Sequence, residues 1–100
     1  MPDIICLGEA LIDMVSAQPG MGLVQSTTFE KAAGGAPTNV AAGVSILGVE
    51  SGIIAKVGAD HFGEFLRQTL FDAEVNLDHF LTTPDYATQL AFVALNSQGV

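Results

Sequence analysis

The segment Ala33-Gly34-Gly35-Ala36-Pro37-Thr38-Asn39-Val40-Ala41 constrains the fold of this chain more than any other. Two adjacent glycines allow the backbone to approach a ligand without interference from a Cβ atom. Pro37 suits the first position of a helix, where its missing N–H costs no hydrogen bond. Asn39 then lies in the first turn, beside free backbone N–H groups and the positive end of the helix dipole. The segment therefore predicts either a cradle for a small polar ligand or a simple turn from a loop into a helix.

The chain is apolar for its length. Hydrophobic residues make up 49% of its 100 residues, and charged residues make up only 14%. A core of this size does not easily cover so much apolar surface, so we expect a fragment of a larger domain or a chain with a partner. The last residues, 96–100, are typical of a hairpin turn that leads into a further strand.

Charge and cysteine content exclude several classes of partner. The net charge is −8, and three basic residues are too few to neutralise many phosphates, so we expect no nucleic acid. The same charge argues against an anionic membrane surface, and no apolar run reaches the length that spans a bilayer. Cys6 is the single cysteine, which rules out a disulfide framework or a cysteine-rich metal site. Because the N-terminus also lacks the pattern of a secretory signal, we expect a cytoplasmic protein.

Extended segments alternate with helical ones along the chain. Residues 4–7 are a short apolar run, which predicts a strand buried on both faces, and residues 51–57 and 88–95 are two further predicted strands. Residues 11–15 and 23–29 are expected to be extended and to form a hairpin away from the main sheet. This order predicts an α/β fold with a parallel sheet and right-handed crossovers. The segments near 11–29 and 88–100 are candidates for a separate small sheet.

Two helices are predicted between these strands. The first spans residues 37–47 and ends at Gly48, with its small residues favouring close packing on a sheet. The second begins after Asp60, which is expected to cap it. The spacing of apolar residues predicts these core-facing positions: Val40, Val44 and Leu47 on the first helix; Phe62, Phe65, Leu66 and Leu70 on the second.

Asp13 is the carboxylate whose surroundings most need an explanation. It lies among Leu11, Ile12, Met14 and Val15. Its two oxygens only accept hydrogen bonds, which suits two neighbouring sugar hydroxyls. The alternative is a solvated residue on an edge strand, since an unpaired buried charge is costly. Phe92 is a second candidate, able to close over the face of a sugar or to pack in the core.

Familiar nucleotide and metal motifs are missing from the sequence. The glycine pair belongs to no G-x-x-x-x-G-K-[ST] loop, and no G-x-G-x-x-G follows the first strand. His61 and His79 are far apart and have no partners at metal-ligand spacing, so we expect no metal site here.

Four separated segments carry a resemblance to a known family. They are Leu7-Gly8-Glu9-Ala10-Leu11-Ile12-Asp13, Gly34-Gly35-Ala36-Pro37-Thr38-Asn39-Val40-Ala41, Gly48, and Gly58-Ala59-Asp60-His61-Phe62-Gly63-Glu64-Phe65-Leu66. In this order, over nearly the whole chain, they resemble the ribokinase-like (PfkB) carbohydrate kinases. The resemblance implies that residues 1–100 are the N-terminal, sugar-binding part of a ribokinase-like domain, with a parallel sheet flanked by helices.

The resemblance also implies roles for individual residues. Asp13, Gly34, Gly35 and Asn39 are expected to hold the hydroxyls of the sugar. The segments near 11–29 and 88–100 resemble part of the β-lid that closes over the sugar, which implies a homodimer formed through the lid. Closure would exclude water from phosphoryl transfer.

The implied activity is transfer of the γ-phosphoryl group of ATP to a sugar hydroxyl. Ala36-Pro37 after the glycine pair is more similar to fructokinases than to ribokinases, with 2-keto-3-deoxygluconate kinases and other sugar or nucleoside kinases as alternatives. The family's catalytic aspartate and its sites for ATP and Mg²⁺ belong to the C-terminal half. We therefore expect no catalytic residue here and no activity from these 100 residues alone. A non-catalytic fragment for sugar binding or assembly is the competing hypothesis.

Overall fold

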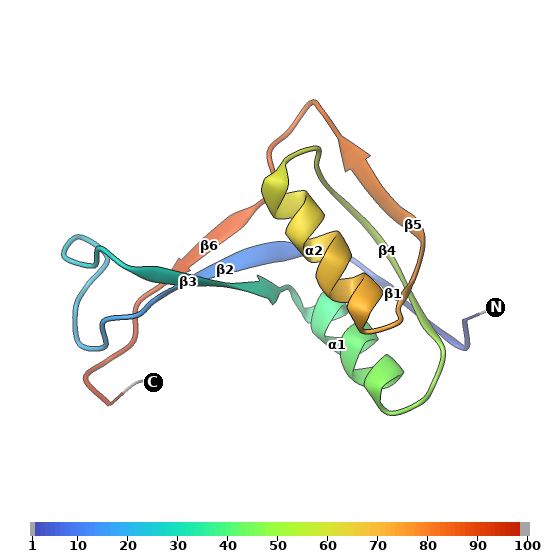
Figure 1. Ribbon diagram of the computed structural model, residues 1–100, viewed down its shortest axis with the longest axis horizontal. Coiled ribbons are helices and arrows are strands. Elements are labelled where there is room, and N and C mark those ends of the chain that lie inside the picture. The colour runs from blue at the N-terminus through green and yellow to red at the C-terminus, as the bar shows by residue number, and fades with distance from the viewer. Residues whose placement is uncertain (1, 99–100) are drawn as a thin grey trace.

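A parallel sheet of three strands forms one half of the structure, a computed structural model that describes residues 2–98 (Figure 1). Its strands are β1 (Ile4–Leu7), β4 (Ser51–Gly58) and β5 (Asn76–Thr83), in the order β1-β4-β5. β4 is parallel to both neighbours, as the alternation of strands and helices predicts. We call this three-stranded sheet the main sheet.

A second sheet of three strands extends from the main sheet, and we call it the small sheet (Figure 1). Its central strand β2 (Leu11–Ser16) is antiparallel to β3 (Phe29–Gly34) and parallel to β6 (Leu90–Val93). The separate sheet expected from the extended segments is therefore present. The hairpin's second strand begins only at Phe29, since residues 23–25 form a turn and residues 26–28 belong to neither a helix nor a strand. The turn expected over residues 96–100 lies partly outside the described residues.

Two helices cover one face of the main sheet. They are α1 (Ala36–Ile46) and α2 (His61–Asp72), and both lie in front of the main sheet in Figure 1. Alternate residues of β4 point toward them, and the buried core contains Ile53, Ala55, Val57, Ala41, Leu66, Leu70 and Phe80. The helices thus seal a single apolar layer. No helix among the described residues combines the length and apolar character needed to cross a bilayer.

The opposite face of the main sheet is bare, which corrects the expectation of a strand buried on both faces at residues 4–7. Ile5 is 51% exposed and Leu7 is 75% exposed. Ile54 and Leu81 share this face by register and are also exposed. β1 is an edge strand with helices on one side only, so its apolar run is half uncovered.

The buried face of α1 differs from the predicted one. Val40 and Leu47 are 50% and 83% exposed, whereas Thr38 and Ala41 are almost fully buried. Small residues face the sheet because they let the helix axis approach it closely. The many small residues of this helix predict such close packing. The helix stops as predicted, with Gly48 at a φ of +92°.

One strand was not predicted. β5 follows α2 and pairs with β4 in the main sheet, although the sequence pattern predicts no strand between α2 and residue 88. Most residues of β5 are polar, and Phe80 is buried between exposed neighbours. The reason is that β5 is also an edge strand with one bare face. The strand predicted at 88–95 is the shorter β6 and belongs to the small sheet.

Candidate sugar-binding site

Two backbone segments pass each other closely where the small sheet joins α1. Gly8 has a φ of +148°, and a Cβ there would lie 2.7 Å from Pro37 Cγ. Gly35 has a φ of +94°, and a Cβ there would lie 2.5 Å from the carbonyl oxygen of Glu9. Side chains at either position would separate the segments, so both glycines are required for the approach.

The carboxylate of Asp13 lies over Gly34. Asp13 is at the middle of β2, and Gly34 ends the neighbouring strand β3. A Cβ on Gly34 would lie 2.5 Å from Asp13 Oδ2 and 2.8 Å from Cγ. Asp13 is half-buried, and no hydrogen bond to its carboxylate occurs within residues 2–98. A carboxylate that is partly desolvated and unpaired is ready to accept hydrogen bonds from a ligand.

The N-terminus of α1 is the second polar element of the site. Gly35 is the N-cap residue and gives no side-chain hydrogen bond, and the first turn contains no acidic residue. The backbone N–H of Asn39 donates to the carbonyl of Gly35 at 3.1 Å, so the exposed Asn39 lies one turn into the helix. The first N–H groups of α1 and the Asn39 carboxamide are thus available for a polar ligand.

Strand register separates Phe92 from the other predicted site residues. Asp13 pairs with Ala91 and Met14 pairs with Phe92. Since neighbouring residues on a strand point to opposite faces, Phe92 lies on the face opposite Asp13. Its ring instead meets Phe29 edge-to-face, with centroids 5.6 Å apart. The structure therefore brings Asp13, Gly34 and Gly35 together, with Asn39 one turn away, but it does not bring Phe92 to them.

The same register identifies two residues that sequence reasoning missed. Ala91 lies directly beside Asp13 and Val93 lies beside Val15, so both face the Asp13 side of the small sheet. In the sequence, Phe92 is the candidate for contact with a sugar in that strand because its aromatic ring is large. Only the pairing between β2 and β6, two segments far apart in sequence, reveals which of the alternating residues shares a face with the carboxylate.

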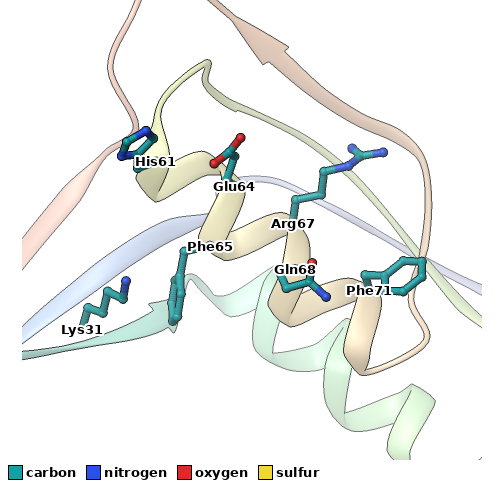
Figure 2. A pocket seen from close by; sticks show the side chains of 7 residues that line it. All are labelled: Lys31, His61, Glu64, Phe65, Arg67, Gln68 and Phe71. Carbon is teal, nitrogen blue, oxygen red and sulfur yellow. The ribbon is translucent and has the colours of Figure 1, made fainter.

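A groove among the described residues lies away from this site. It has a volume of about 660 Å³ and lies along the outer face of α2, as Figure 2 shows. Lys31 reaches it from β3 and places its Nζ 4.5 Å from the centre of the Phe65 ring. Lys31 pairs with Met14, so this groove lies on the face opposite Asp13. Residues 2–98 hold no cluster of three His, Cys, Asp or Glu side chains that would suit a metal ion.

This architecture defines the class of the protein as a ribokinase-like α/β fold. Residues 1–100 match the family described as "pfkB family carbohydrate kinase", and the chain belongs to that family. It is 46% identical over 98 residues to the Arabidopsis thaliana protein named "Probable fructokinase-6, chloroplastic". The expected family is thereby confirmed.

Solved structures of similar proteins agree. The fructokinase from Xylella fastidiosa matches 97% of this chain with a TM-score of 0.82 and 43% identity. A sugar kinase from Pyrococcus horikoshii, solved in complex with ATP, matches 89% with a TM-score of 0.85 and 44% identity. The chain spans 26% of the Arabidopsis protein and 30% and 29% of the two structures, respectively.

Proposed function

We propose that this chain is the sugar-binding part of an ATP-dependent carbohydrate kinase that phosphorylates fructose. The observation that carries the proposal is the unpaired, half-buried Asp13 carboxylate beside Gly34, close to the uncapped start of α1. Fructose is favoured as the acceptor because fructokinases are prominent among the similar proteins.

Each residue of the site has a distinct task in this proposal. Asp13 accepts hydrogen bonds from two neighbouring hydroxyls, and Asn39 donates to one hydroxyl while it accepts from another. Gly34 leaves room for the Asp13 carboxylate, and Gly35 holds the start of α1 against the Glu9 backbone. Ala91 and Val93 give the site a small apolar wall, since both lie on the Asp13 face. Together they orient the acceptor hydroxyl, which is the part of phosphoryl transfer that depends on positioning.

The donor side of the reaction lies elsewhere in this proposal. The described residues contain no glycine-rich phosphate loop and no cluster of metal ligands, so they do not fit ATP and Mg²⁺. We therefore assign no step of the transfer to them. Closure of the small sheet as a lid would exclude water from the bound sugar.

The small sheet is also the proposed contact between two copies in a cytoplasmic homodimer. Phe92 is 53% exposed on the face away from Asp13, and Val24 at the far end is 95% exposed. These exposed apolar side chains are the observation that supports a contact through the small sheet. Light scattering of the natural protein, with Phe92→Ser as the variant, tests the dimer.

A kinase assay of the natural protein in full length tests the function. Fructose, ribose, 2-keto-3-deoxygluconate and a nucleoside are compared with ATP as donor, and fructose should give the highest kcat/KM. Asp13→Ala should raise the sugar KM and lower kcat, because the lost hydrogen bonds orient the reacting hydroxyl. Phosphorylation of none of these acceptors would refute the kinase proposal, and an unchanged KM in Asp13→Ala would remove Asp13 from the site.

A further inference from the structure

Within the described residues, the chain passes three times between the small sheet and the main sheet with its helices. The crossings lie at residues 8–10, between β1 and β2, at Gly35, between β3 and α1, and at 84–89, between β5 and β6. The first two hold each other by the close contacts of Gly8 and Gly35. The third contains no glycine and needs another anchor.

Asp60 is that anchor. Its Oδ2 accepts a hydrogen bond from the backbone N–H of Thr88 at 2.8 Å, and its Oδ1 accepts one from the Thr88 hydroxyl at 2.6 Å. Oδ1 also accepts from the N–H of Gly63 at 2.8 Å, which caps α2. Thr88 Oγ1 in turn accepts from the N–H of Gly58 at 3.1 Å. One carboxylate thus joins the end of β4, the start of α2 and the third crossing.

Helix capping alone does not require this arrangement. A capping aspartate needs only the N–H groups of the first turn, whereas Thr88 is 28 residues away in sequence and only 5% exposed. The backbone around Asp60 and Thr88 also packs too closely for side chains at the neighbouring glycines. A Cβ on Gly58 would lie 2.5 Å from both Asp60 Oδ2 and the Thr88 nitrogen, and a Cβ on Gly63 would collide with the Gly58 carbonyl.

The anchor lies a short distance along the chain from the sugar site. The carbonyl of Gln89, directly after Thr88, accepts a hydrogen bond from the N–H of Ile12 at 3.0 Å. Two residues later Ala91 lies beside Asp13. α2 also contacts the other edge of the small sheet, because Lys31 of β3 and Phe65 of α2 point toward one another in Figure 2. α2 therefore contacts β3 through Phe65, and its N-cap residue Asp60 binds the segment just before β6; β3 and β6 are the two outer strands of that sheet.

We propose that Asp60 is a positioning residue for the small sheet. Its carboxylate, fixed at the start of α2 by the N–H of Gly63, sets the location of Thr88 and so the placement of β6 against β2 beside Asp13. The effect on sugar binding rests on the function proposed above, whereas the effect on the small sheet does not.

Three variants separate this role from capping and from general stability. Thr88→Val removes the hydroxyl but keeps the branched shape, and Thr88→Ser keeps the hydroxyl. Asp60→Asn remains a good N-cap but presents an N–H₂ group that cannot accept from Thr88. Thr69→Val is the matched control, since its hydroxyl bonds only to the Phe65 carbonyl within α2.

Hydrogen exchange and kinetics are measured on the full-length natural protein. Thr88→Val and Asp60→Asn should speed amide exchange in residues 90–93 by about tenfold or more without ligand, the loss expected for a hydrogen bond to a charged group. Their sugar KM should rise about three- to tenfold, with the ATP KM and kcat within about twofold. Thr88→Ser and Thr69→Val should resemble the wild type in both measurements.

The two readouts distinguish failure of this proposal from failure of the proposed function. Unchanged exchange in residues 90–93 would overturn the anchor, as would exchange that rises equally throughout β4. Faster exchange confined to the small sheet, in a protein that phosphorylates no sugar, would support the anchor and refute the kinase.

Discussion

Replacing Gly34 by Ala should weaken sugar binding while leaving the fold intact. The new Cβ would lie 2.5 Å from Asp13 Oδ2 and 3.0 Å from Oδ1, so the carboxylate must rotate away. These are the outer atoms of a side chain that can change rotamer, and Gly34 does not have a positive φ. The backbone therefore keeps its path. The substitution displaces one functional group and little else.

The expected magnitudes differ for stability and for binding. Moving Asp13 off its rotamer costs about 0.5–1.5 kcal/mol, and the reduced freedom of the unfolded chain returns about 0.4–1 kcal/mol, so the free energy of unfolding should change by less than about 1 kcal/mol. A hydrogen bond to a charged group contributes about 1.5–3 kcal/mol, which corresponds to a loss of sugar affinity of about ten- to 150-fold.

Two other glycine substitutions serve as controls. Gly35→Ala places a Cβ 2.5 Å from the Glu9 carbonyl oxygen at a φ of +94°, and this strain should cost about 1–3 kcal/mol or more. Gly43→Ala meets nothing within 4 Å on α1 and should stabilise by about 0.5–1 kcal/mol without affecting the sugar. Calorimetric sugar titration and chemical denaturation measure both quantities. A Gly34→Ala protein that binds fructose normally, or that unfolds as easily as Gly35→Ala, would refute the reasoning.

Two further predictions concern the small sheet and its anchor. Ala91→Leu should raise the sugar KM about tenfold or more because its side chain enters the Asp13 face, whereas Phe92→Ala should leave that KM within about twofold; equal effects would contradict the register. The hydrogen bonds from the Thr88 hydroxyl and N–H, and from Gly63, outweigh desolvation and hold the pKa of Asp60 below its ordinary value of 3.8. The stability that they contribute is thus fully present above that value and is lost as the pH falls through the lowered pKa. Denaturation from pH 2 to 7 should show the stability difference between wild type and Asp60→Asn shrinking only below about pH 4, and a constant difference would refute it.

Local signals in the sequence were sufficient for the elements that depend on neighbouring residues. Asp60 caps α2 through Gly63, and Gly48 ends α1 with a positive φ, both as their residue types predict. The glycine pair also begins a helix as predicted. In each case the decisive interaction joins residues within a few positions of each other.

The errors have a common physical origin in long-range packing. Burial of Ile4–Leu7 depends on what covers the second face of the main sheet, and no property of the run itself reveals that. β5 escaped prediction because an edge strand with one bare face carries a polar pattern. The role of Asp60 beyond capping required a residue 28 positions away. Segment patterns carry no information about such partners.

Register in the small sheet decides what the Asp13 carboxylate faces. A strand has only two faces, so a slip of β6 by one residue would exchange Ala91 for Phe92 beside Asp13. The small neighbour leaves space for a sugar, whereas the aromatic ring would fill it. Thr88 is fixed by Asp60 two residues before β6 begins, and such a fixed point upstream of a four-residue strand opposes slippage. The capping aspartate of α2 and the carboxylate on β2, which are unrelated in sequence, are therefore coupled through the choice between two adjacent side chains.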